Sequence, residues 1–132
     1  MKEFFAPGPK LQGWVIVVAR VVLGAIFIAH GWQKLNNMDA IVGFFGTLGM
    51  PGFMAYVVAL VEFLGGIAVL IGAWTLWAGR LIALVMVGAI VLVKFKMGFM
   101  GGYELDLGLL ALALCVSAFG PGPMAFSRRL SS

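Results

Sequence analysis

The most constraining feature of this sequence is an apolar run, residues 12–35, that contains three ionisable side chains. As an α-helix the run is long enough to cross about 30 Å of hydrocarbon. It contains Arg20, His30 and Lys34, and a helical rotation of about 100° per residue places them within roughly 80° of one another. A charge at the centre of a membrane helix costs at least about 2.5 to 3.5 kcal/mol. This side of the helix is therefore expected to face other helices or a wet cavity.

The composition indicates that the solvent for this chain is a lipid bilayer. Of its 132 residues, 63% are hydrophobic and 11% are charged, and the mean hydropathy is +1.11. A soluble domain of this size has too little interior to bury so much apolar surface. The apolar segments follow one another without a long polar linker, so residues 1–132 are interpreted as a single membrane domain.

Four segments are long and apolar enough to span the membrane, which predicts an all-α, polytopic four-helix bundle. After Asp39, residues 40–48 form an apolar piece that is too short to span and that Gly49 and Pro51 end. This piece is expected to be an interfacial or re-entrant segment between the first two helices. The predicted spans are residues 11–35, 52–73, 76–96 and 103–119.

The charges predict an orientation and exclude one class of partner. Four crossings put both termini on one side, and the excess of basic residues there favours a cytoplasmic location for both. The formal charge of +4 is scattered around the helix ends and forms no basic run, so nucleic acid is not expected as a partner. The bilayer is the expected surrounding, and the chain could form homo- or hetero-oligomers.

Residue types also exclude several chemistries. The single cysteine, Cys115, allows no internal disulfide and no Cys-x-x-Cys pair, and it is predicted to be a small buried hydrophobe. One histidine cannot supply paired axial haem ligands, and no set of Cys and His has metal-ligand spacing. No nucleophile triad or phosphate-cradling loop is present. We therefore predict no catalytic residue, no metal site and no intrinsic cofactor.

An ion pair between Arg20 and Glu62 is predicted from the estimated depths of the two residues. Each lies about 14 to 15 Å from one end of its helix, and consecutive helices joined by a short connection are neighbours. The guanidinium would hold the glutamate ionised and offer it bidentate hydrogen bonds. Two interpretations stay open at this point: a clamp between the helices, or a proton-handling group or polar floor of a ligand pocket.

A second polar cluster is predicted at the non-cytoplasmic end of the first helix. It could bind the head of a quinone or another small polar ligand whose tail lies between helices. The alternative is ordinary interfacial anchoring by Lys and Trp side chains. The residues of this cluster are His30, Trp32, Gln33, Lys34, Lys94 and Glu104.

The order and spacing of several motifs resemble the DoxX family of small bacterial four-helix membrane proteins. The resemblance covers nearly the whole chain. Late in the third helix, where the family often has a histidine, this chain has Lys94 or Phe95, and after GPG it reads PMAFSRRL where the family usually ends with Ser-Leu-Asp. The matching elements are Arg20, LGAIFIAHGWQKL (23–35), FFGTLGMP (44–51), Glu62 with FLGGIAVLIG (63–72), Arg80, GFMGGYEL (98–105) and GPG (120–122).

The resemblance implies a multi-pass protein of the bacterial inner membrane that works beside soluble or peripheral redox proteins. Relatives in the family are linked to a thiosulfate:quinone oxidoreductase, to oxidoreductase complexes of oxidative-stress defence and to quinone detoxification. The resulting hypothesis is a membrane subunit or partner of a quinone-linked oxidoreductase, with quinone as the possible cofactor and no catalysis by the chain alone. The alternative is a non-enzymatic scaffold that assembles a larger membrane complex.

Overall fold

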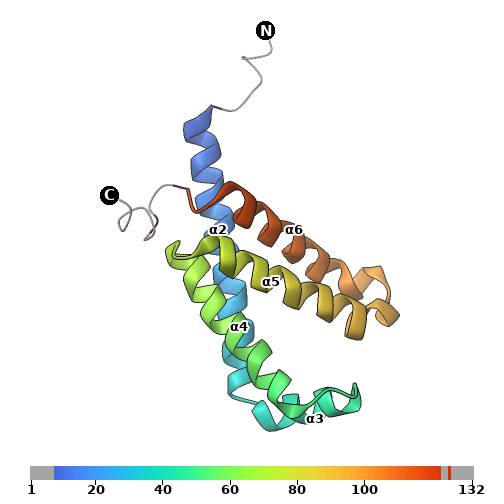
Figure 1. The fold of residues 1–132 in the computed structure, drawn as a ribbon. Coiled ribbons are helices and arrows are strands. Elements are labelled where there is room, and N and C mark those ends of the chain that lie inside the picture. Colours follow the sequence, from blue (N-terminus) through green and yellow to red (C-terminus); the bar gives the residue numbers. More distant parts are fainter. Residues whose placement is uncertain (1–7, 123–124, 126–132) are drawn as a thin grey trace.

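The computed structural model describes residues 8–122 and residue 125, and it places them in four long helices arranged as two antiparallel pairs (Figure 1). The first pair consists of α2 (Pro9–Leu35) and α4 (Gly52–Ile71). The second pair consists of α5 (Thr75–Ala89), with its short continuation, and α6 (Glu104–Phe119). The predicted all-α membrane bundle of four helices is confirmed.

The first pair packs closely because small residues line its interface. Gly24 of α2 lies so near α4 that a Cβ atom there would be 2.8 Å from the carbonyl oxygen of Gly66. At Gly31, a Cβ atom would be 2.5 Å from the backbone nitrogen of Phe63. Small residues at such crossings let two membrane helices approach without lipid between them. Ala55, Ala59, Glu62 and Gly66 are buried along one side of α4.

A short helix, α3 (Met38–Thr47), connects the first pair. It begins after α2 ends at Leu35, where the side-chain amides of Asn36 and Asn37 donate to the carbonyl oxygens of Trp32 and Gln33. Its ten residues include none that is buried, and it packs mainly against α4. The predicted short segment between the first two spans is therefore a helix, and it lies at the lower end of the bundle in Figure 1.

The second pair has an irregular end. After α5, the chain winds into a π-helical turn, η1 (Ile90–Lys94), and a 3₁₀ turn, η2 (Phe95–Met97). The turn η3 (Phe99–Tyr103) then leads into α6. Widened turns of this kind change which way the following side chains point, and they occur often at functional sites. Here the π-helical turn carries Lys94.

The two pairs meet at one end of the bundle and diverge toward the other (Figure 1). Where they meet, buried side chains from α2, α4, α5 and α6 form one hydrophobic core around Leu23, Phe27 and Ile82. Where they diverge, α3 lies near the opening between them. The members of the core are Leu23, Phe27, Val69, Ala78, Ile82, Ala83, Met86, Leu109, Ala113 and Val116.

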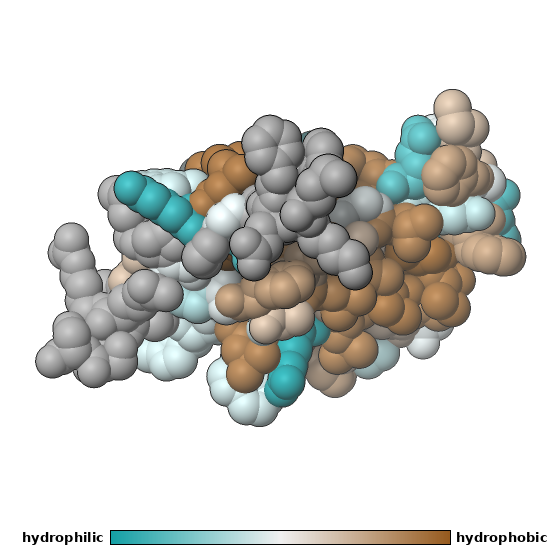
Figure 2. Space-filling model, turned by 90° about the horizontal axis from the view of Figure 1, so that it is seen from above, coloured by the Kyte–Doolittle hydropathy of each residue, from teal (hydrophilic) through white to brown (hydrophobic). Residues whose placement is uncertain are grey.

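The outer surface is suited to lipid. Figure 2 shows a broad hydrophobic surface with a few hydrophilic groups, and many large apolar side chains are exposed. Cys115 is also exposed on this surface, so the prediction that it is buried is wrong. The reason is the rotation of α6: Asp106, Leu109, Ala113 and Val116 face inward, which turns Cys115 outward.

Candidate functional site

The first element of the site is an ion pair between α2 and α4. Lys34 lies in the last turn of α2, and its Nζ donates to Oε1 of Glu62 at 2.6 Å. The Glu62 side chain is 2% exposed, whereas that of Lys34 is 27% exposed. A carboxylate buried to this extent needs a partner of opposite charge, and Lys34 provides that partner for Glu62.

Arg20 does not pair with Glu62, which corrects the sequence-based prediction. Arg20 of α2 instead lies beside Gly72, which follows α4 and is ten residues beyond Glu62 in the chain. A Cβ atom at Gly72 would be 2.7 Å from Nη1 of Arg20. Its Nη1 donates to the carbonyl oxygen of Pro121, 2.6 Å away, which ties the chain after α6 to α2. The depth estimate failed because α2 has 27 residues and is about 40 Å long. A residue about 14 Å from one side of the bundle and a residue about 15 Å from the other side are therefore not at the same level.

A second ion pair joins the other two spans. Nζ of Lys94, on η1, donates to Oδ1 of Asp106 at 3.3 Å. The Asp106 side chain is 7% exposed and that of Lys94 is 35% exposed. Each helix pair thus carries its own lysine–carboxylate pair, and both lie in the half of the bundle where the pairs diverge.

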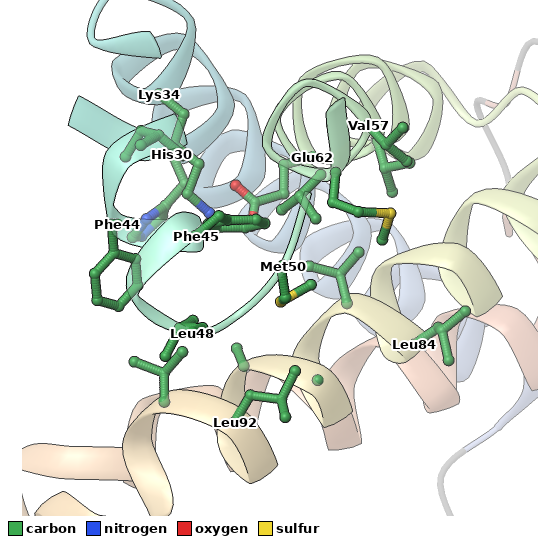
Figure 3. A pocket seen from close by; sticks show the side chains of 18 of the residues that line it. His30, Lys34, Phe44, Phe45, Leu48, Met50, Val57, Glu62, Leu84 and Leu92 are labelled. Carbon is green, nitrogen blue, oxygen red and sulfur yellow. The ribbon is translucent and has the colours of Figure 1, made fainter. Parts of the chain in front are cut away.

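A cavity of about 580 Å³ occupies this half of the bundle. Its polar residues are His30, Lys34, Glu62 and Lys94, and the rest of its wall is almost entirely apolar. Figure 3 shows His30, Lys34 and Glu62 gathered at one side, with Phe44, Phe45 and Leu48 from the α3 region and Leu84 and Leu92 around the remainder. Other apolar wall residues are Ile41, Met50, Met54, Val57, Val58, Val61, Leu81, Val85, Ala89 and Val93.

Three of the six predicted cluster residues line this cavity and three do not. His30, Lys34 and Lys94 all line it. Trp32 is 58% exposed and packs against Phe63 in a tilted arrangement, with ring centroids 5.9 Å apart. Gln33 is exposed, and the carboxylate of Glu104 accepts a hydrogen bond of 2.9 Å from the backbone N–H of Gly101. Trp32, Gln33 and Glu104 are therefore not wall residues of the cavity.

Sequence reasoning missed two parts of the site. Glu104 was the acidic residue of the last helix predicted for the polar cluster, whereas the buried acidic residue is Asp106, two residues later. The signal was present, since Asp106, Leu109, Ala113 and Val116 recur at the spacing of one helical face. The apolar wall supplied by α3 was also missed, because a short apolar helix indicates an interfacial position but not which helices it covers.

The arrangement can hold a mostly apolar molecule with a small polar head. Lysine ammonium groups and an imidazole offer hydrogen-bond donors at one end, and a carboxylate offers acceptors beside them. Such a combination, an apolar pocket with a few convergent polar groups, is typical of small-molecule sites. Within residues 8–122 and 125, no group of three or more His, Cys, Asp or Glu side chains is placed to hold a metal ion.

The fold and the cavity together define a class: a small multi-pass membrane protein with a lipid-facing exterior and an apolar pocket that has paired charges at one end. The DoxX family pattern matches residues 15–95, which is more than half of the chain. The chain belongs to the DoxX family. This region includes most of α2, all of α3, α4 and α5, and the ion pair of Lys34 with Glu62.

Three curated proteins are similar over most of their length. The Bacillus subtilis (strain 168) protein named "Putative oxidoreductase CatD" is 42% identical over 104 residues, which cover 79% of this chain and 78% of that protein. "Inner membrane protein YqjF" of Escherichia coli (strain K12) is 32% identical over 133 residues, covering 92% and 96%. "Uncharacterized membrane protein Rv3486" of Mycobacterium tuberculosis is 33% identical over 132 residues, covering 88% and 81%. No solved structure matches the chain significantly.

Proposed function

We propose that this protein is the quinone-binding membrane subunit or partner of an oxidoreductase system. The observation that supports this function is the cavity of about 580 Å³, which is apolar along most of its wall and polar at one end. A quinone has the same division, since its hydrocarbon tail needs an apolar channel and its two carbonyl oxygens need hydrogen-bond donors. Lys34, Lys94 and His30 supply donors at the polar end.

The tail would lie between the helix pairs. The apolar wall runs from Val57 and Val61 on α4 to Leu81 and Leu84 on α5, and α3 covers part of it with Phe44 and Phe45. Several side chains of this wall, including Leu84 and Leu92, are exposed on the lipid-facing surface, so a hydrophobic molecule would reach the wall from the bilayer without crossing water.

Electrons would come from or go to a partner protein. The chain has one cysteine and one histidine, so it lacks the residues for a dithiol pair or a paired-histidine haem of its own. The name of the Bacillus subtilis relative, which includes the word oxidoreductase, is consistent with a redox system around proteins of this type. We therefore assign the chain a binding role beside a catalytic redox protein.

The protein would lie in the bacterial inner membrane with both termini in the cytoplasm. One of the similar proteins is named an inner membrane protein. Lys10 and Arg80 lie toward the end where the chain begins, and the sequence adds basic residues at both termini. The cavity end has Lys34, Lys94 and Lys96 but also Asp39, Glu104 and Asp106, so the basic excess is on the terminal side.

The test is purification of the tagged protein from its native membrane in a gentle detergent, followed by mass spectrometry of co-purifying proteins and of extracted quinones. We expect an oxidoreductase and quinone in near-stoichiometric amounts. Retained quinone should fall about tenfold in His30→Ala, because a head-group donor is lost. Gln33→Ala, an exposed neighbour that does not line the cavity, is the matched control and should retain quinone.

Two results would contradict the proposal. Recovery of a non-redox assembly without quinone would favour the scaffold function. Equal quinone in the wild type and in His30→Ala and Lys34→Ala, with the assembly intact, would place any bound quinone outside this cavity.

A further inference from the structure

Two buried carboxylate oxygens near the cavity have no hydrogen-bond donor among the residues that the structure describes. Glu62 uses Oε1 for Lys34, and its Oε2 accepts no hydrogen bond from the part of the chain that the structure describes. Asp106 accepts the hydrogen bond from Lys94 at Oδ1, and its Oδ2 also accepts no hydrogen bond from the described residues. Both residues are more than nine-tenths buried. Leaving such an oxygen without a donor costs about 1 to 3 kcal/mol, and more for a charged group.

Both carboxylates line a recess of about 90 Å³ beside the large cavity. The recess and the large cavity share His30, Lys34, Glu62, Ala89 and Lys94, so the recess adjoins the polar end of the cavity. The remaining recess residues are Asp106 and the apolar side chains of Phe27, Met86 and Leu109. A polar group entering from the large cavity thus meets donors and acceptors together.

The two oxidation states of a quinone head make different demands on these groups. A quinone carbonyl oxygen only accepts hydrogen bonds, so it can use the lysine and histidine donors but leaves Oε2 of Glu62 without a partner. A quinol hydroxyl both donates and accepts, so it can donate to Oε2 of Glu62 and accept from a lysine N–H. A methoxy group of similar size cannot donate at all.

We propose that the site selects the reduced, dihydroxy form of its ligand and that Glu62 is the residue that determines this specificity, as acceptor for one ring hydroxyl. The inference rests on the proposed function, because it concerns the head of the same ligand. Asp106 lies further inside and is available to the same hydroxyl or to a water molecule that bridges it to Glu62. Sites built to bind a hydroxyl discriminate strongly against analogues without one, since their own polar groups are then left unpaired.

The experiment compares three ligands with the same decyl tail: a benzoquinol, the corresponding benzoquinone and the O,O-dimethyl ether of the quinol. The full-length protein is placed in lipid nanodiscs without oxygen, and the dissociation constant of each ligand is measured by equilibrium dialysis. We expect the quinol to bind roughly 10- to 100-fold more tightly than the other two, which corresponds to one hydrogen bond to a charged acceptor.

Variants show whether Glu62 is the cause. Glu62→Gln keeps the size of the side chain but puts an NH₂ donor in place of one acceptor oxygen, so the preference for quinol should fall to threefold or less, about the precision of such a measurement. The matched control is Glu104→Gln, an exposed carboxylate that does not line the recess, and it should keep the wild-type preference. The wild-type comparison alone remains decisive if Glu62→Gln fails to fold.

The possible results separate this inference from the proposed function. If the three ligands bind the wild type equally, or the quinone binds more tightly, the inference is overturned while quinone binding stands. If none of the three binds, the proposed function itself fails. A quinol preference that Glu62→Gln leaves unchanged also overturns the inference, because another residue then recognises the hydroxyl.

Discussion

Among single residues, the cation that pairs with Glu62 decides how the polar end of the cavity is built. The carboxylate is 2% exposed and its partner is Lys34, at 2.6 Å. Removing one member of a buried pair leaves an uncompensated group, which is more damaging than removing both. Arg20 has a different contact, to the carbonyl oxygen of Pro121.

A double-mutant cycle distinguishes the two pairings. Lys34→Ala should lower the free energy of unfolding by about 1 to 3 kcal/mol, and the double change with Glu62→Ala should cost less than the sum of the single changes. Arg20→Ala and Glu62→Ala should instead be additive within about 0.5 kcal/mol, because the two residues share no contact. The measurement is helix content during unfolding in mixed micelles. Coupling between Arg20 and Glu62, with none to Lys34, would contradict this assignment.

The residue types of the site could be predicted from the sequence, but their pairing could not. An ionisable side chain within an apolar span must face the interior, and this identified His30, Lys34 and Glu62. Pairing depends on the offset between two helices, and that offset is set by contacts such as Gly31 against Phe63. The predicted offset was wrong by about ten residues, since Arg20 lies beside Gly72 and Lys34 beside Glu62.

At the scale of elements, the α2–α4 interface depends on the absence of side chains at its crossings. A Cβ atom at Gly31 would lie 2.5 Å from the backbone of Phe63, which cannot move aside without displacing α4. Gly108, on α6, has nothing within 4 Å of the position where a Cβ atom would stand. These two glycines therefore make a matched pair.

Gly31→Ala should destabilise the protein by about 1 to 3 kcal/mol through overpacking. Gly108→Ala should leave stability unchanged or raise it by up to about 1 kcal/mol, since Ala is the better helix former. Thermal unfolding in detergent, followed by circular dichroism, measures both. A larger loss in Gly108→Ala than in Gly31→Ala would show that the close approach of α2 and α4 is wrong.

The position of α3 gives a further prediction about ligand affinity. Because α3 has no buried residue, Phe45→Ala should change the melting temperature little. It should still weaken binding of the decyl-tailed quinol about tenfold, because Phe45 is part of the apolar wall. Phe53→Ala, which removes a 64% exposed ring that does not line the cavity, is the control. If Phe45→Ala binds the quinol as tightly as Phe53→Ala does, α3 is not part of the binding site.

At the scale of the whole molecule, two helix pairs converge at one end and enclose a cavity at the other. The four spans themselves could be predicted from length and apolarity, and the sequence placed their ends within a few residues. The divergence of the pairs could not, because the length and apolarity of a span do not fix the angle at which it packs on its neighbours.

The orientation proposed for the whole molecule predicts the behaviour of fusions. Alkaline phosphatase fused after the last residue should be inactive, and a green fluorescent protein at the same place should fluoresce, because both termini are assigned to the cytoplasm. Phosphatase fused after Met97, between the third and fourth spans, should be active. The reverse pattern would place the cavity on the cytoplasmic side.

The most direct test of the central claim is photo-crosslinking with a decyl-tailed azidoquinone, followed by peptide mapping in the mass spectrometer. If the cavity between the helix pairs holds the quinone-class ligand, the labelled positions should fall within 41–50, within 54–62 and within 81–94, and an excess of unmodified quinol should abolish the labelling. Labelling confined to outward-facing residues such as Val18, Trp77 or Phe119, or labelling that competitor does not reduce, would contradict the account.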